Sequence, residues 1–368
     1  MRILIDASSL LLRSAGVKTY FYHWITHLRQ QAGGDRIFAF PFLNELGELH
    51  HDRSVLCPRQ TWPRLGLVYA AKFGWSPVVD LLTINTDVFH ISNLVRNPPR
   101  RPLVTATIHD LTYALMPDVH TPANVQADTG YAERVLKKAR RLIAVSENTR
   151  RDAVHVLGIP PDRVSVIYPG VAPVFFDVDA ARVAEVRHKL GIEKDYVLFV
   201  GTIEPRKNVG GLLDAWESLA DEYRDQFRLV IAGPEGWRSE SVMARLEKGM
   251  NGVRYAGYVP EQDLPALTAG ARVLAYPSLY EGFGFPVAQA MAAGVPVITS
   301  NVSSLPEVTG PGGILIDPRS PAELASGLKS ILLSPSLRER LAGAAKRQAL
   351  RYQWDRCAQE SLEFFREL

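Results

Sequence analysis

The chain has 368 residues, of which 46% are hydrophobic and 22% are charged, and its formal net charge is only +3. This length suits two domains of ordinary size, and the composition is that of a folded globular protein. No segment approaches the ~20 uninterrupted apolar residues of a membrane-spanning helix. The two cysteines, Cys57 and Cys357, are too far apart in sequence to indicate a disulfide framework or a metal site.

The first residues of the chain superficially resemble a signal peptide. Asp6 and Arg13 interrupt the apolar run, however, and Arg2–Ile5 fits a first β-strand better. We therefore expect a cytoplasmic protein.

Apolar runs of strand length alternate with helical patterns along the chain. Helical spacing is clearest in Val17–Gln31, Asn124–Arg140, Asn208–Glu222 and Glu240–Met250. The strands predicted in the first half are Ile3–Asp6, Arg36–Phe42, Val88–Ile91, Leu103–Ile108, Leu142–Val145 and Val164–Tyr168. Those predicted in the second half are Tyr196–Val200, Arg228–Ala232, Val253–Ala256, Val273–Tyr276, Val295–Thr299 and Ile314–Ile316.

Unbroken apolar strands between helices indicate parallel sheets that are covered on both faces. The two alternating runs predict an α/β fold with two doubly wound, Rossmann-like domains facing across a cleft. The strand pattern breaks between Tyr168 and Ala181, so we place an N-terminal domain at 1–172 and a C-terminal domain at 173–353. A separate amphipathic helix is predicted at 354–368. Because ligands of such sheets bind beyond the carboxyl ends of the strands, the segments after strands are the candidate sites.

A glycine-spaced turn follows the strand Val273–Tyr276 and leads into a helix. Glycines in such a turn let backbone N–H groups approach a ligand, and the helix start favours negative charge. Glu281 lies on the turn and can accept hydrogen bonds from hydroxyls, and Gln289 lies eight residues later, in the helix. The turn suits a phosphate or a sugar hydroxyl; the alternative is an ordinary strand–turn–helix joint. The backbone groups expected to assist belong to Phe283, Gly284 and Phe285.

Two cations lie in the segment Gly201–Asn208, which follows a strong strand and precedes a helix. Arg206 offers a planar fork of donors and Lys207 a point charge, and both suit a diphosphate. The alternative is two solvated cations before a helix.

Further candidates follow two strands of the first half. His109, at the end of Leu103–Ile108, could hydrogen-bond a sugar hydroxyl or titrate near neutrality. The alternative is a histidine with a structural role. Ala15 and Gly16, in the turn after the first strand, can present backbone N–H groups to a phosphate. No G-x-G-x-x-G pattern occurs there, which argues against a nicotinamide enzyme.

We predict no metal site and no cofactor. Asp177 and Asp179 form a D-x-D pattern, but they lie in the segment between the domains, and nothing else in the sequence points to a metal. The basic excess of the chain is N-terminal, and it is read either as solvated helix ends or as a patch facing anionic lipid headgroups or an anionic lipid-linked acceptor. Aromatic residues do not interleave with these cations, so no nucleic-acid partner is expected. The cations are Arg96, Arg100, Arg101, Lys137, Lys138, Arg140 and Arg141.

Several of these motifs, taken together and in order, resemble the retaining glycosyltransferases of family 4, which have the GT-B architecture. The similar segments are AGVKTY from Ala15, TIHDL from Thr107, AVSENTRRD from Ala144, GTIEPRKNV from Gly201 and EGFGFP from Glu281. The resemblance implies that Lys207, with Arg206, contacts the donor diphosphate and that His109 lies against the donor sugar. It also implies that Glu281 binds sugar hydroxyls, that the loop of Ala15 and Gly16 lies near the diphosphate and acceptor, and that the last helix crosses back to the N-terminal domain.

This sequence departs from the family pattern at two places. Gln289 stands where the family has a second Glu that holds the ribose hydroxyls. Thr202 or Ile203 stands where the family usually has an Arg, so Arg206 is the expected partner of Lys207.

The resemblance therefore implies a metal-independent retaining hexosyltransferase that uses a nucleotide sugar, with GDP-mannose or a related GDP- or UDP-hexose as the donor. The GTIEPRKN variant is most similar to bacterial mannosyltransferases and rhamnosyltransferases of surface polysaccharide assembly. The expected acceptor is a glycan or a lipid-linked acceptor. The alternative from another class is a two-domain sugar or nucleotide-sugar binding protein that closes on its ligand without chemistry.

Overall fold

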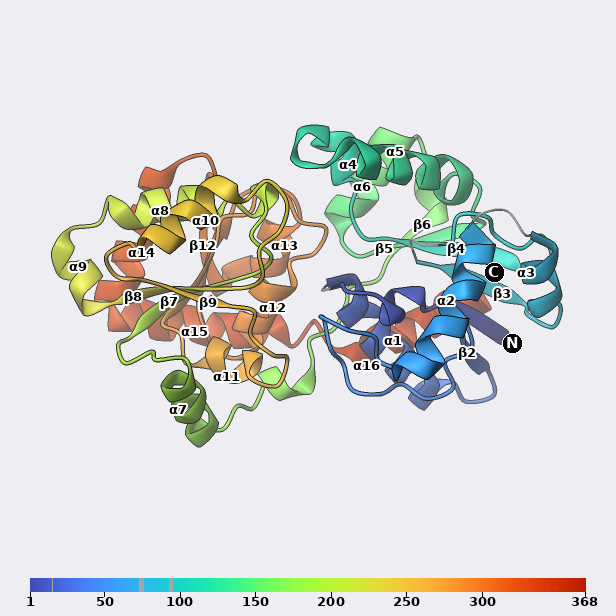
Figure 1. Ribbon diagram of the computed structural model, residues 1–368, viewed down its shortest axis with the longest axis horizontal. Helices are drawn as coiled ribbons and strands as arrows, with labels where there is room; N and C mark the ends of the chain where they lie inside the picture. The colour runs from blue at the N-terminus through green and yellow to red at the C-terminus, as the bar shows by residue number, and fades with distance from the viewer. Residues whose placement is uncertain (15, 73–75, 93–94) are drawn as a thin grey trace. The chain divides into compact units, whose positions relative to one another are not determined.

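The computed structural model describes residues 1–14, 16–72, 76–92 and 95–368. These residues divide into two compact units, Met1–Gly170 with Gln353–Leu368, and Val171–Tyr352. Each unit holds a parallel six-stranded sheet between layers of helices (Figure 1). None of the helices in the described ranges has the length and apolar character needed to cross a bilayer.

The first unit has the strand order β2-β1-β3-β4-β5-β6. The strand order changes direction between β1 and β3, because β2 lies on one side of β1 and β3 to β6 follow on the other. The loops after β1 and β3 therefore lead to opposite sides of this switch point. The strands are β1 (Arg2–Asp6), β2 (Arg36–Phe40), β3 (Val88–Ile91), β4 (Leu103–Ile108), β5 (Arg141–Ala144) and β6 (Val164–Val166). The helices are α1 (Gly16–Gln31), α2 (Pro58–Lys72), α3 (Ser76–Leu82), α4 (Thr112–Leu115), α5 (Pro122–Tyr131), α6 (Glu147–Leu157) and α16 (Trp354–Arg366).

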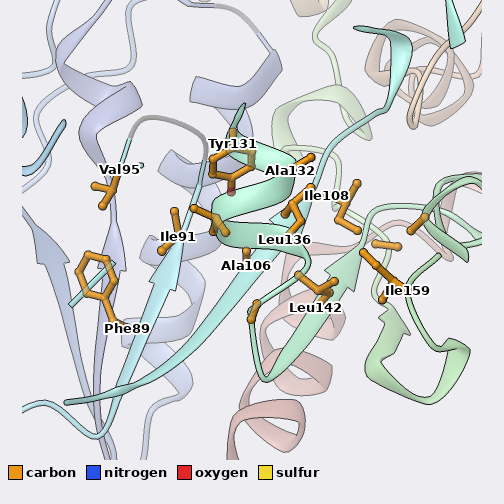
Figure 2. Close-up of a cluster of buried hydrophobic side chains, with 14 of the residues drawn as sticks. Phe89, Ile91, Val95, Ala106, Ile108, Tyr131, Ala132, Leu136, Leu142 and Ile159 are labelled. Atoms are coloured by element: carbon orange, nitrogen blue, oxygen red, sulfur yellow. The ribbon is translucent and has the colours of Figure 1, made fainter. Parts of the chain in front are cut away.

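Apolar side chains from neighbouring strands form a core on one face of this sheet. Figure 2 shows Ile91 of β3, Ile108 of β4 and Leu142 of β5 beside Tyr131 and Leu136 of the covering helical segment. All five are buried, and burying one such side chain contributes about 1.5–3 kcal/mol. The core holds the strands in register and so supports the loops at their carboxyl ends.

Helix α16 packs against α1 within the first unit. The Trp24 indole N–H donates to the Ser361 hydroxyl at 2.9 Å, and His27 Nδ1 lies 2.9 Å from an Asp355 carboxylate oxygen. The rings of His23 and Trp354 stack at 5.5 Å. These contacts join the end of the chain to its beginning.

The second unit has the strand order β12-β11-β10-β7-β8-β9. Here the switch point lies between β7 and β10, which are neighbours although a long stretch of chain separates them. The strands are β7 (Tyr196–Val200), β8 (Arg228–Ala232), β9 (Val253–Gly257), β10 (Val273–Tyr276), β11 (Val297–Ser300) and β12 (Gly313–Ile316). The helices are α7 (Ala180–Lys189), α8 (Val209–Glu217), α9 (Asp221–Gln226), α10 (Glu240–Lys248), α11 (Leu264–Ala269), α12 (Phe285–Ala292), α13 (Leu305–Thr309), α14 (Pro321–Leu333) and α15 (Pro335–Ala349).

Two helices predicted from the sequence are interrupted in the structure. In Asn124–Arg140 the α-helix ends at Tyr131 and a π-helical turn follows, in which the Lys137 N–H donates to the Ala132 carbonyl five residues back. Asn208–Glu222 divides into α8 and α9 at Ser218, whose hydroxyl donates to the Ala215 carbonyl and competes with the helical ladder. The other predicted elements agree to within one or two residues at each end.

Candidate active site

The loops that follow β7 and β10 meet at the switch point of the second unit. After β7 the chain forms a single 3-10 turn, Pro205–Lys207, and Asn208 then takes a left-handed conformation at φ 53°. The Asn208 amide donates to the carbonyls of Pro277, at 3.2 Å, and Pro318, at 2.7 Å. The Leu279 N–H donates to the Arg206 carbonyl at 2.8 Å. These bonds fix the two loops to one another. Asparagine suits this position because it accepts the left-handed conformation more readily than most residues.

The meeting of these loops brings Lys207 and Glu281 together. Lys207 Nζ lies 2.6 Å from Glu281 Oε1 and 2.7 Å from the Tyr276 hydroxyl, which in turn donates to Glu281 Oε1 at 3.0 Å. The Ser278 hydroxyl donates to the same oxygen at 2.7 Å. Lys207 and Glu281 are both buried, so their charges attract one another at a lower effective dielectric constant than at the surface.

Arg206 joins the same carboxylate from its other side. Its Nη1 lies 3.0 Å from Glu281 Oε2 and 2.9 Å from the Tyr280 carbonyl oxygen, and its Nη2 lies 2.8 Å from a Glu204 carboxylate oxygen. Two cations and two carboxylates thus share one cluster. A diphosphate could displace the Glu281 carboxylate from the cations because it offers more negative charge and the same fork geometry.

The electrostatics of the cluster keep Glu281 ionised. Burial alone would raise the pKa of Glu281, but the charges of Arg206 and Lys207 and the hydrogen bonds from Lys207 and Ser278 outweigh burial and lower it to about 2. Burial and the neighbouring Arg206 guanidinium lower the pKa of Lys207 below its usual value, against the opposing carboxylates of Glu281 and Glu204. Burial raises the pKa of Tyr276 well above its usual range, so its hydroxyl remains a hydrogen-bond donor.

Two serines hydrogen-bond to the backbone of the glycine turn. Ser304 donates to the carbonyls of Glu281, at 2.9 Å, and Phe283, at 3.0 Å. The Glu281 N–H donates to the Ser303 hydroxyl at 3.0 Å. Gly284 has φ 98°, and a Cβ there would lie 2.9 Å from a methyl of Leu305, so this position needs glycine.

The first turn of α12 uses its own backbone donors. Pro286 has no N–H, and the N–H groups of Val287 and Ala288 donate to the Gly284 carbonyl at 3.1 and 3.2 Å. The expectation that the N–H groups of Phe283, Gly284 and Phe285 assist a ligand concerns other residues than these and stays a prediction. The Phe283 ring is buried against Phe285 and Tyr352, so its side chain has a packing role.

Gln289, also on α12, is half-buried. Within the described part of the chain no group hydrogen-bonds its side-chain amide, which leaves the amide available to a ligand.

His109 follows β4 in the first unit and is a neutral imidazole. Its ring meets Tyr20 and Phe21 edge-on, at 5.1 and 5.7 Å, and burial lowers the pKa of His109 to about 4 against the opposing charge of Asp110. Titration near neutrality, one of the properties expected from the sequence, is therefore wrong. Its Nε2 is buried, and no hydrogen-bond partner for it occurs in the described ranges. This nitrogen can donate a hydrogen bond to a hydroxyl or accept one from it, according to the tautomer, while the ring stays neutral.

The loop after β1 is described only in part. Ala15 lies outside the described residues, and Gly16 is the exposed first residue of α1. Lys18, two residues later, is fully buried, and its Nζ donates to the carbonyls of Leu12, at 2.7 Å, and Arg53. Burial lowers the pKa of Lys18 to about 8, with the charge of Asp52 acting in the opposite direction. Lys18 therefore joins this loop to the segment around Arg53.

The sequence pattern did not single out several residues of these sites. Glu204 lies within the segment GTIEPRKNV, Tyr276 ends a predicted strand and Ser278 follows it, but no role was predicted for them. Contacts between the loops, such as that of Lys207 with Tyr276, depend on which strands are neighbours. Lys18 lies in a predicted helix, and nothing in the sequence indicates that its side chain is buried.

The described residues contain no group of three or more His, Cys, Asp or Glu side chains placed to hold a metal ion. Asp179 of the D-x-D pattern instead begins α7, where its carboxylate accepts from the Ala181 N–H at 3.0 Å. Of the N-terminal cations, Lys137 pairs with Glu133 and Arg141 with Glu367. Arg100, Lys138 and Arg140 are exposed.

Comparison with known proteins identifies the family. Residues 183–348 match the family model "Glycosyl transferases group 1", and residues 14–174 match the model "Glycosyltransferase Family 4". The chain is 33% identical over 274 residues to the O-antigen chain mannosyltransferase B of Escherichia coli, a match that covers 74% of this chain and 72% of that protein.

Two solved structures share the fold. WaaG, a glycosyltransferase involved in lipopolysaccharide biosynthesis, aligns with a TM-score of 0.75 at 18% identity, over 99% of both chains. Anabaena Alr3699/HepE in complex with UDP-glucose aligns with a TM-score of 0.74 at 19% identity, over the whole of both chains. The expected α/β fold with two doubly wound domains is confirmed, and the chain belongs to the glycosyltransferases of family 4.

Proposed function

We propose that this glycosyltransferase transfers a hexose, with mannose from GDP-mannose as the favoured donor, to a glycan or lipid-linked acceptor in surface polysaccharide synthesis, and that it retains the configuration of the sugar. The observation that carries the proposal is the cluster of Arg206, Lys207 and Glu281 at the switch point of the second unit. Similarity to an O-antigen mannosyltransferase supports the choice of mannose. The UDP-glucose complex of the Anabaena protein supports a nucleotide-sugar donor of this general kind.

In the proposed reaction the bond between the anomeric carbon and the diphosphate oxygen breaks, and its electron pair stays on the diphosphate. Arg206 and Lys207 hold that leaving group, and their charges stabilise the negative charge that develops on it. The acceptor oxygen attacks from the same face, and its proton passes to the departing phosphate oxygen. Glu281 accepts hydrogen bonds from hydroxyls of the sugar, and His109 Nε2 exchanges one with a hydroxyl as a neutral group.

Two measurements test the donor and the stereochemistry. The melting temperature of the protein should rise more with GDP than with UDP or ADP, because a ligand that binds only the folded state stabilises it. Incubation with GDP-mannose and a mixture of glycan acceptors should then release GDP, and NMR of the product should show an α-linked sugar. A β-linked product would contradict retention, and release of UDP from UDP-glucose without any reaction of GDP-mannose would contradict the proposed donor.

We also propose that the protein works in the cytoplasm without a cofactor and that its exposed cations bring it to an anionic membrane surface. Arg100, Lys138 and Arg140 support this, since each cation near such a surface contributes about 1 kcal/mol of attraction. Co-sedimentation with vesicles that contain an anionic lipid, compared with neutral vesicles, measures this attraction.

A further inference from the structure

Glu204 is a buried carboxylate for which the proposed reaction has no role. It precedes the 3-10 turn of Arg206 and Lys207, and only 6% of its surface is exposed. A carboxylate at this place is unfavourable for binding a diphosphate, because like charges repel more strongly away from bulk water. Its presence therefore calls for a physical reason.

The backbone beside Glu204 is firmly held. The Ile203 N–H donates to the Pro234 carbonyl at 2.9 Å, and the Ile203 carbonyl accepts from the Gly236 N–H at 3.0 Å. These bonds join the loop after β7 to the loop after β8, as one rung of a parallel ladder would. The carboxylate of Glu204 thus projects from a fixed point of the unit.

The guanidinium of Arg206 bonds to two carboxylates and, through Nη1, to the Tyr280 carbonyl at 2.9 Å. Its Nη2 bonds to Glu204 at 2.8 Å, and its Nη1 bonds to Glu281 at 3.0 Å. In the proposed reaction sugar hydroxyls compete for Glu281, and the diphosphate competes for both cations. Arg206 then loses its contact with Glu281, while the Nη2 contact with Glu204 need not break, since Glu204 has no role in binding the sugar.

We propose that Glu204 is a positioning residue, which holds the Arg206 guanidinium in the orientation that the leaving diphosphate requires during transfer. This inference rests on the proposed function and concerns the same site. A guanidinium can donate through Nη2 to a fixed carboxylate and still direct its other N–H groups at a phosphate, because its five donors lie in one rigid plane.

Positioning and simple charge predict opposite effects when Glu204 is removed. The two cations and two carboxylates of the cluster sum to zero, so loss of the Glu204 charge leaves a net charge of +1. By Coulomb attraction alone, that change strengthens the binding of a diphosphate and its developing charge. Loss of orientation instead slows transfer.

The test compares Glu204→Ala and Glu204→Gln with Glu217→Ala, which removes an exposed carboxylate of the same unit that also pairs with an arginine, Arg245. Steady-state kinetics with GDP-mannose give kcat and KM, and calorimetry gives the Kd of GDP. For Glu204→Ala we expect kcat to fall about 30-fold, because a small misplacement of a positioning group has effects of this size, with the Kd of GDP changed less than about 3-fold. Glu204→Gln keeps the acceptor oxygen and should recover most of kcat, and Glu217→Ala should match the wild type.

Three results would overturn the inference. One is a Glu204→Ala variant with the same kcat as Glu217→Ala, and a second is a variant with raised kcat and tighter GDP binding, which is the signature of charge alone. A third is a Glu204→Gln variant as slow as Glu204→Ala. If Glu204→Ala does not fold, Glu204→Met decides, because it keeps the volume of the side chain but has no carboxylate oxygen: a fall of kcat of about 3-fold or more supports positioning, and an unchanged or raised kcat overturns it. If the wild type binds no nucleoside diphosphate and turns over neither GDP-mannose nor UDP-glucose, the proposed function fails and the role of Glu204 fails with it.

Discussion

Lys18 in the first unit and Lys207 in the second are both buried, and the two lysines have different partners. In the first unit Lys18 Nζ donates to the backbone carbonyls of Leu12 and Arg53. In the second unit Lys207 Nζ bonds to the Glu281 carboxylate and the Tyr276 hydroxyl. Backbone carbonyls are part of the fold and cannot leave, so Lys18 acts as a clamp between two segments. A carboxylate side chain can be released to a ligand, so the Lys207 pair can exchange partners.

Titratable groups near the strand ends also differ between the two units, in their charge. Those of the second unit are charged and neutralise one another. Two histidines of the first unit, His90 and His109, are neutral near pH 7. Burial lowers the pKa of His90 to about 3, with repulsion from a protonated His109 acting in the same direction, and burial lowers the pKa of His109 to about 4. The cluster of the second unit could therefore bind a ligand through charge, whereas His109 of the first unit could form only neutral hydrogen bonds.

The largest expected effect is the fall in the rate of transfer when Lys207 is removed. Lys207→Ala should slow transfer by roughly 30- to 1000-fold, since losing one charge-assisted contact to a developing phosphate charge costs on the order of 2–4 kcal/mol. The control is Lys329→Ala, which removes an exposed lysine of the same unit. Steady-state turnover of GDP-mannose by both variants, with circular dichroism to check folding, measures the effect. A folded Lys207→Ala variant with the turnover of the control would show that Lys207 does not hold the diphosphate.

Acid should destabilise the first unit before the second. A buried histidine with a lowered pKa binds its proton more readily in the unfolded chain. Its contribution to stability is therefore complete above about pH 6.5 and falls by about 1.4 kcal/mol per pH unit below it, until the folded pKa is reached. For His90 this window extends down to about pH 3 and for His109 to about pH 4. Glu281, with its pKa lowered from 4.5 to about 2, loses its contribution only as the pH falls from about 4.5 towards 2.

Hydrogen exchange at pH 7.5 and pH 5.0, corrected for intrinsic rates, compares the two units. The amides of β4 in the first unit should lose protection at the lower pH, and those of β7 in the second should keep it. Loss of protection in β7 first would mean that the charged cluster, rather than the neutral histidines, determines the acid sensitivity.

Removal of Lys18 should lower the stability of the fold more than it lowers the rate of transfer. Lys18→Met keeps the length of the side chain but removes the hydrogen bonds from the charged Nζ to the carbonyls of Leu12 and Arg53, and a hydrogen bond to a charged group contributes about 1.5–3 kcal/mol. We expect a lower melting temperature and a smaller midpoint in urea, with a rate per folded molecule within about 3-fold of the wild type, equivalent to about 0.7 kcal/mol. An unchanged melting temperature would refute the clamp.

Gln289→Glu tests whether the second unit tolerates one more negative charge. A carboxylate accepts hydrogen bonds from ribose hydroxyls more strongly than an amide, so GDP binding should be kept or tightened by about 1 kcal/mol at most. Calorimetry with GDP measures the change. Binding weakened by roughly ten-fold or more, about 1.4 kcal/mol, would mean that the amide N–H₂ of Gln289 donates an essential hydrogen bond.

Chelation should have no effect on turnover. The Arg206 and Lys207 side chains supply the positive charge that a divalent ion provides in other sites. Turnover of GDP-mannose should be the same before and after dialysis against EDTA. An activity lost on chelation and regained with magnesium or manganese would show that the diphosphate is held by a metal.

The sequence by itself determined where the strands end and which chemical groups follow them. Period and composition placed β7 and β10, the glycine turn at Gly284 and the cations Arg206 and Lys207, because these signals are local. Local signals were weaker for long helices: Asn124–Arg140 and Asn208–Glu222 were predicted as continuous, and a π-helical turn and the Ser218 hydroxyl interrupt them.

Only the tertiary structure decided which of these groups meet. Lys207 and Glu281 are 74 residues apart, and they touch because β10 pairs with β7 at the point where the sheet reverses its order. Glu204 and Arg206 are only two residues apart, but the sequence did not show that Glu204 would be buried. The neutrality of His109 likewise comes from the rings of Tyr20 and Phe21, which belong to another element. Charge and protonation depend on burial and neighbours, and neighbours that are distant in sequence are set by the packing of the sheet.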